Sequence, residues 1–160
     1  MGNAMFESES TEVLRDRGED PPANVEIVRR VMDAHARRDW DTVFALYDPD
    51  IEWDQSRNPY AIDLPTTGRG HDAVRAWFRR MGEAWELYSY EDEGMAEAED
   101  HVVQFIRWRA RGRTSGIELE RPFAQVWQLR DGRVVRVEYF PNRAEALAAV
   151  GLPRQELDLS

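Results

Sequence analysis

The 160-residue chain contains no cysteine and no lysine. Without cysteine it has no disulfide framework, no thiolate ligand for a metal and no thiol nucleophile. No apolar run approaches the roughly 18 residues that a transmembrane helix needs, and no signal-peptide pattern opens the chain. The three histidines are scattered, and the chain has neither a phosphate-binding glycine loop nor a dinucleotide fingerprint. We therefore expect a soluble cytoplasmic protein with no metal, no cofactor and no membrane partner.

Acidic residues outnumber basic ones by 31 to 21, and the formal net charge is -10. Nucleic acids are bound by clustered basic surfaces, and a net negative charge repels them. We therefore expect no nucleic-acid partner. Many of the acids fall within residues 83–100, where no basic residue occurs. Such an acidic run is typical of an exposed edge strand.

The spacing of apolar residues changes from a helical period to a strand period near residue 87. A capping-box pattern of Asn142 and Glu145 begins the last helix, and Asn24 and Asp41 are the predicted N-caps of the first two helices. The predicted elements are helices over 24–38, from Asp41 to about Asp48, over about 71–86 and after Asn142, and strands over 51–54, 87–98, 102–112, 117–129 and 133–140. This order predicts an α+β fold with an antiparallel sheet.

The chain is predicted to form one domain over residues 24–151. Residues 1–23 are acidic and end in Pro21-Pro22, which indicates a flexible N-terminal arm, and residues 152–160 form a C-terminal tail. A loop over 55–69 is rich in proline, glycine and threonine. Loops of that length within compact domains are often lids or pocket rims.

A two-residue turn at Asp131-Gly132 predicts a hairpin, because both central positions favour positive φ. If the turn is a two-residue loop, residue i on one strand faces residue 263 − i on the next, so that Gln125 and Glu138 pair on a face that also carries apolar side chains. Burial among those side chains would raise the pKa of the Glu138 carboxyl, which suits a general base. The structural alternative is an ion pair of Glu138 with Arg136 or Arg107.

The orientation of Arg107 depends on the loop before the hairpin. A three-residue loop at 114–116 places Phe105 and Arg107 on the face of Gln125, and a two-residue loop turns the strand over. An unpaired buried guanidinium costs several kcal/mol. An inward Arg107 would therefore require a carboxylate or an anionic ligand.

The opposite face of the predicted hairpin is also apolar. One chain with few helices would not easily cover both faces of the sheet. We therefore expect one face to pack on the helices and the other on a second copy, in a two-fold homodimer.

Three segments of the sequence resemble the nuclear transport factor 2-like superfamily, in its SnoaL-like, ketosteroid-isomerase-like branch. They are RRDWDTVFALYDPDIEWD, the Gly70-His71-Asp72-Ala73-Val74 start of a helix, and VWQLRDGRVVRVEYF. The resemblance covers about residues 24–151 and implies a curved sheet wrapped around helices to form a conical cavity, the cystatin-like α+β cone, with dimers formed through the sheet. Members include polyketide cyclases, isomerases, an epoxide hydrolase and proteins that only bind ligands, so the fold does not decide the activity.

The resemblance transfers few catalytic residues. Ketosteroid isomerases use an Asp base with a Tyr and a protonated Asp as oxyanion hole, and the matching positions here are Trp53, next to Asp54, with Val31 and Gln125. The epoxide-hydrolase pattern pairs Arg-x-Asp with a second Asp. Here Glu138 matches the second Asp and Arg107 the Arg, but Arg109 replaces the paired Asp.

Besides a dimerising protein whose main partner is another polypeptide, two functions remain open. The first is a cofactor-independent isomerase, cyclase or lyase that acts on an apolar cyclic or polyketide-like compound. In it Glu138 would be the acid/base, Arg107 and Gln125 would stabilise an oxyanion, and Asp54 would be a second acid/base. The other is a non-catalytic dimeric module that binds a small apolar molecule. The predicted pocket residues, of which His35 has a structural alternative as a core histidine, are His35, Tyr47, Trp53, Trp77, Phe105, Phe123, Trp127 and Phe140.

Overall fold

The computed structural model describes residues 23–61 and 65–153. The predicted arm at 1–23 lies outside these residues except for Ala23, as do residues 62–64 of the predicted loop and most of the C-terminal tail. In chain order the elements are α1 (Asn24–Ala36), α2 (Trp40–Leu46), β1 (Tyr47–Asp54), β2 (Thr67–Arg69), α3 (His71–Ala84), β3 (Trp85–Ala98), β4 (His101–Gly112), β5 (Glu118–Arg130), β6 (Arg133–Phe140) and α4 (Arg143–Ala149).

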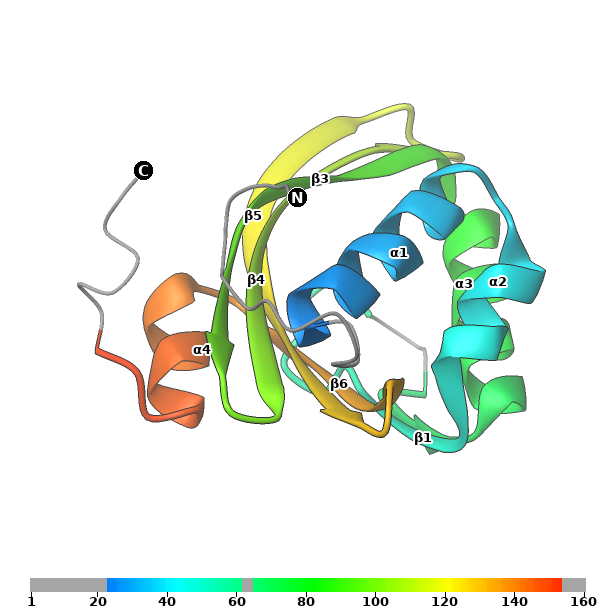
Figure 1. Ribbon diagram of the computed structural model, residues 1–160. Helices are drawn as coiled ribbons and strands as arrows, with labels where there is room; N and C mark the ends of the chain where they lie inside the picture. The colour runs from blue at the N-terminus through cyan, green and yellow to red at the C-terminus, as the bar shows by residue number, and fades with distance from the viewer. Residues whose placement is uncertain (1–22, 62–64, 154–160) are drawn as a thin grey trace, which may run out of the picture.

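The six strands form one curved sheet in the order β2-β1-β6-β5-β4-β3. The neighbouring strands from β3 to β6 pair antiparallel as predicted. However, β1 pairs parallel with β6, so the sheet is mixed rather than purely antiparallel. Helices α1, α2 and α3 lie on the concave side, and α4 lies on the outer side (Figure 1). The acidic β3 is an edge strand, as the charge pattern predicts.

The core lies between the concave face of the sheet and the helices. The sequence of α3 carries an apolar stripe at helical spacing, Val74, Trp77, Phe78 and Met81, and of these Val74, Trp77 and Met81 are buried. On α1 the buried side chains include Val28 and Val31, which the helical spacing also selects. Between these helices and the sheet the packing leaves a cavity.

The helix caps agree with the sequence in part. Asn142 accepts a hydrogen bond from the backbone N–H of Glu145 at 2.9 Å, so the predicted N-cap is confirmed, and the Asn142 side-chain amide donates to the Glu145 carboxylate at 2.9 Å. Helix α2 is capped by Asp39 instead of Asp41, and α1 begins one residue early, with Ala23 at its N-cap. The Asp39 carboxylate accepts hydrogen bonds from both the backbone N–H and the hydroxyl of Thr42, at 3.2 and 2.7 Å, which favours Asp39 as the N-cap.

Part of the outer face of the sheet is covered by α4 (Figure 1). Leu147 and Ala146 of that helix form a second apolar cluster with Val103, Phe105, Ala124, Val126 and Phe140. These side chains are already buried within one chain. One chain therefore covers the part of this face that lies under α4, and the homodimer stays a prediction. None of the described helices has the length and apolar character needed to cross a membrane.

Candidate functional site

A cavity of about 60 Å³ lies between α1, α3 and the concave face of the sheet. A single water molecule requires about 10–15 Å³, so the cavity has room for several. Helices α1 and α3, strands β1 and β3 to β6, and the segment after β1 all contribute to its wall. The lining residues are Val31, Met32, His35, Tyr47, Trp53, Gln55, Asn58, Tyr60, Trp77, Phe78, Met81, Tyr90, Ile106, Trp108, Arg121, Phe123, Gln125, Trp127 and Tyr139.

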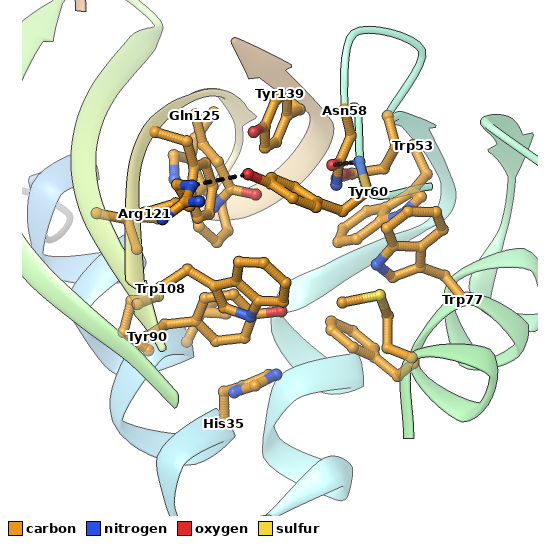
Figure 2. Close-up of a pocket in the computed structure, with 18 of the residues that line it drawn as sticks. His35, Trp53, Asn58, Tyr60, Trp77, Tyr90, Trp108, Arg121, Gln125 and Tyr139 are labelled. Atoms are coloured by element: carbon orange, nitrogen blue, oxygen red, sulfur yellow. Dashed lines mark hydrogen bonds between the residues drawn. The ribbon is translucent and has the colours of Figure 1, made fainter. Parts of the chain in front are cut away.

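Aromatic rings form the sides of the cavity. Trp53 and Trp77 lie on one side and Trp108 and Tyr90 on the other (Figure 2). Neighbouring rings fix one another by edge contacts and by stacking: the ring of Phe123 stacks on Tyr139 with centroids 4.8 Å apart. The result is a narrow apolar space with flat walls.

Polar side chains gather at one end of the cavity, around Gln125, Tyr139, Tyr60, Asn58 and Arg121 (Figure 2). The Nε of Arg121 donates to the Tyr60 hydroxyl at 3.0 Å, and the side-chain amide of Asn58 donates to the side-chain Oε1 of Gln55 at 3.0 Å. Because Arg121 is exposed, this end reaches solvent and forms the mouth of the cavity.

His35 lies at the opposite end, on α1 (Figure 2). Its ring packs between Trp40, Phe78 and Tyr90, with centroid distances of 5.0 to 5.3 Å. Burial, together with the nearby positive charge of Arg38, lowers the pKa of His35 to about 4. The imidazole is therefore neutral at physiological pH. Among the described residues, nothing hydrogen-bonds to its buried Nε2 atom.

Three tyrosines of the cavity, Tyr47, Tyr90 and Tyr139, keep their protons. Burial raises the pKa of Tyr139 to about 12, and it raises the pKa of Tyr47 and Tyr90 further. Their hydroxyls therefore remain available as hydrogen-bond donors at any physiological pH.

The predicted pairing of Gln125 with Glu138 is wrong. Both turn residues have positive φ, 54° at Asp131 and 80° at Gly132, so the predicted turn is present. An irregularity next to Leu129 then shifts the register by one residue, and Gln125 pairs with Tyr139 while Val126 pairs with Glu138. A single extra residue in one strand turns every later side chain to the other face.

Glu138 consequently lies on the outer face, away from the cavity, and Asp54, its neighbour on β1, does not line the cavity either. The Glu138 carboxylate binds Arg57 and, at 3.3 Å, Arg136. Asp54 accepts hydrogen bonds from Ser56 and from Arg136 at 2.6 to 3.1 Å. Burial acts to raise the pKa of Asp54, but these hydrogen bonds outweigh burial and hold that pKa below its usual value. Both carboxylates are ion-paired, which is the structural alternative that the sequence offered for Glu138.

Arg107, Phe105 and Phe140 also lie outside the cavity. The β4–β5 connection leaves Gly112 bonded to Ile117, so Gln104 and Ile106 take the places on the face of Gln125 that were predicted for Phe105 and Arg107. Arg107 donates to Glu93 on the outer face at 2.8 Å. The two phenylalanines belong to the cluster under α4. Their prediction fails because it rests on loop lengths and registers that the sequence does not specify.

The other predicted site residues lie on the cavity wall. They are Gln125, His35, Tyr47, Trp53, Trp77, Phe123 and Trp127. Trp127 is fixed there by a hydrogen bond from its Nε1 to the buried Gln104, at 3.0 Å.

The family model for the SnoaL-like domain matches residues 28–137. The chain belongs to this SnoaL-like family. Solved structures show the same fold. An NTF2-like protein of unknown function from Burkholderia pseudomallei is 26% identical with a TM-score of 0.68, over 80% of this chain and 97% of that one. An NTF2-like protein from Burkholderia thailandensis is 29% identical with a TM-score of 0.65, over 80% and 96%.

A more distant structure is that of TerC co-crystallised with polyporic acid. It is 20% identical with a TM-score of 0.67, over 79% of this chain and 96% of TerC. At that identity the likeness concerns the fold alone. No curated protein matches the sequence of this SnoaL-like chain.

Sequence reasoning missed several wall residues of this SnoaL-like domain. Tyr60 and Asn58 fall in the predicted loop 55–69, which was expected to close the pocket but without named residues. Tyr139 and Trp108 were not named, because their faces depend on the registers described above. Arg121 lies near the start of β5, where only the alternation with Phe123 and Gln125 could have indicated that it points inward. Within the described residues, no group of three or more His, Asp or Glu side chains could hold a metal ion.

Proposed function

We propose that this SnoaL-like domain binds a small aromatic molecule in the cavity. One observation supports this most directly. Of the nineteen described side chains that line the cavity, ten are Phe, Trp or Tyr and none is a carboxylate. Apolar pockets with a few convergent polar groups are the usual form of small-molecule sites. In TerC, which shares the fold, co-crystallisation with polyporic acid gives a precedent for a small organic ligand.

The ligand would lie with its ring between the tryptophans and its polar substituent at the mouth. The walls on either side of the space are Trp53 and Trp77 against Trp108 (Figure 2). Gln125 and the Tyr139 hydroxyl would hydrogen-bond the substituent. A ligand with no polar group would displace water from these two groups without replacing its hydrogen bonds, and would therefore bind more weakly.

Binding can be measured by fluorine NMR with 4-fluorobenzamide, a neutral single-ring probe. Met32→Trp adds volume at a half-buried wall position and should abolish binding. Met95→Trp is the matched control, because Met95 is also half-buried but does not line the cavity. Both variants should keep the far-UV circular dichroism of the parent. Equal binding by the two variants would contradict the proposed site.

An isomerase- or cyclase-type activity is the second candidate function. The observation in its favour is the neutral imidazole of His35, whose buried Nε2 atom has no partner among the described residues. Carboxylate catalysis by Glu138 or Asp54 is not part of this candidate, because both groups are ion-paired and neither lines the cavity. A base in the cavity would exchange the α-protons of a bound aromatic ketone with solvent. Incubation of 4-fluoroacetophenone in deuterated water tests this, with His35→Gln expected to remove any catalysed exchange.

A further inference from the structure

Arg121 is the one described side chain on the cavity wall that carries a formal charge at neutral pH, since His35 is neutral there. It pairs across the β4–β5 ladder with Trp108, so both side chains belong to the concave face. Its guanidinium lies at the mouth beside Gln125 and Tyr60 (Figure 2).

The guanidinium of Arg121 has hydrogen-bonding capacity to spare. Its Nε donates to the Tyr60 hydroxyl at 3.0 Å and its Nη1 to the backbone carbonyl of Glu120 at 2.9 Å. A guanidinium has five N–H groups, so three remain for a ligand. The Glu120 carboxylate lies against Arg107 and Arg109 instead, at 3.6 and 3.4 Å. In the part of the chain that the structure describes, Arg121 has no carboxylate partner.

The rest of the wall is also rich in donors. Among the described residues, the buried Nε1–H groups of Trp53 and Trp108 have no acceptor. The Tyr60 hydroxyl accepts from Arg121 and so can direct its own proton toward a ligand. Buried polar groups are nearly always hydrogen-bonded in folded proteins. Buried donors without an acceptor, on the same wall as a guanidinium that has no carboxylate partner among the described residues, therefore call for a ligand that brings acceptors and negative charge.

We propose that the ligand of this cavity is an aromatic carboxylate whose anionic group binds Arg121 at the mouth. The inference rests on the proposed function and makes it specific: the ring occupies the space between the tryptophans, and the carboxylate takes the free N–H groups of Arg121. A guanidinium and a carboxylate match in planar geometry, which gives two parallel hydrogen bonds. An amine would meet no carboxylate on the described wall and would be repelled by Arg121.

Three isosteric probes test the charge preference at neutral pH: 4-fluorobenzoate, 4-fluorobenzamide and 4-fluorobenzamidine, which carry charges of -1, 0 and +1. Fluorine NMR titration should give a Kd for the benzoate about tenfold or more below that of the benzamide, with the benzamidine weakest. Higher salt should weaken the binding of the benzoate far more than that of the benzamide.

Variants separate the charge of Arg121 from its packing. Arg121→Gln should raise the Kd of the benzoate about tenfold or more and change that of the benzamide about twofold at most. Tyr60→Phe removes the Arg121–Tyr60 hydrogen bond but keeps the charge, so benzoate should still bind more tightly than benzamide. Arg130→Gln, at the exposed end of the same strand, is the matched control and should change neither Kd.

The outcomes distinguish this inference from the proposed function. If benzoate and benzamide bind equally, or benzamidine binds most tightly, the cavity is an aromatic site but the carboxylate assignment is overturned. If none of the three probes binds, the proposed function fails and the inference fails with it. Loss of benzoate binding in Arg130→Gln to the same extent as in Arg121→Gln would also overturn the assignment, because the effect would then come from overall charge.

Discussion

Gln125 lies directly opposite Tyr139 on the neighbouring strand, and both side chains line the cavity. The next pair along the ladder, Val126 and Glu138, belongs to the other face of the sheet. The polar end of the cavity is thus an amide beside a phenol, while the carboxylate of Glu138 stays outside in an ion-pair network with Arg57 and Arg136. Any chemistry or binding in the cavity proceeds without that carboxylate.

The first prediction follows from this arrangement. Glu138→Gln should leave the Kd of 4-fluorobenzamide within about twofold and lower the free energy of unfolding by about 1 kcal/mol or less, because partly exposed ion pairs contribute little. Gln125→Leu should raise the same Kd about fivefold, the equivalent of one hydrogen bond. Fluorine NMR titration and urea denaturation measure the two quantities. A larger effect on binding from Glu138→Gln than from Gln125→Leu would contradict the observed register.

Much of the fold could be predicted because each local pattern agreed with the tertiary structure. The stripe on α3, the cap at Asn142 and the turn at Asp131-Gly132 all occur as the sequence indicates. Strand β2 and the parallel pairing of β1 with β6 were missed, because a three-residue strand has no usable period and the direction of pairing depends on distant contacts.

The site was predicted only in part, and the reason is register. Residues on helices and on β1, such as His35 and Trp53, fall on the cavity wall because helical and strand periods fix their faces. On β4 and β6 the face depends on one extra residue in a connection or a bulge, so Arg107 and Glu138 were assigned to the wrong side. Turn chemistry fixes the turn but does not specify a bulge two residues further on.

The second prediction concerns pH and His35. Its pKa is about 4 in the folded protein and near 6.5 in the unfolded chain, so the unfolded state takes up the proton first as pH falls. The stabilisation is fully present above pH 6.5 and is lost progressively as pH falls toward 4. Between pH 7 and pH 5 this one group should lower the free energy of unfolding by about 2 kcal/mol.

His35→Gln should remove that part of the pH dependence, and the measurement is urea denaturation at pH 7 and pH 5. The matched control is His101→Gln, since His101 lies at the start of β4 beside Asp100 and away from the cavity. Carboxylates titrate in every variant, so the difference between the two variants isolates His35. A parent and a His35→Gln variant that lose equal stability on acidification would show that this imidazole is not buried in its neutral form.

The third prediction compares two glycines around α3. A methyl group added to Gly82, inside the helix, meets nothing within 4 Å, whereas one added to Gly68 on β2 lies 2.7 Å from Ala73 Cβ. Gly82→Ala should raise the free energy of unfolding by about 0.5–1 kcal/mol, because alanine favours the helix. Gly68→Ala should lower it by about 1–3 kcal/mol through overpacking between β2 and α3. Thermal unfolding measures both, and the same sign of change in the two variants would refute the close packing of β2 on α3.

The fourth prediction concerns the hydrogen bond that fixes Trp127 in the cavity wall. Gln104 is fully buried, and its Oε1 atom accepts from Trp127 Nε1 at 3.0 Å. Gln104→Met keeps the volume but leaves the indole N–H unpaired, so the free energy of unfolding should fall by about 1–3 kcal/mol. Trp127→Phe removes the donor. In that background Gln104→Met should lower the free energy of unfolding by about 1 kcal/mol less than it does in the parent, and a double-mutant cycle measures this coupling. Additive effects of the two substitutions would mean that the bond contributes nothing to the wall. A positive coupling would show that the hydrogen bond between Gln104 and Trp127 stabilises the cavity wall in the absence of any ligand.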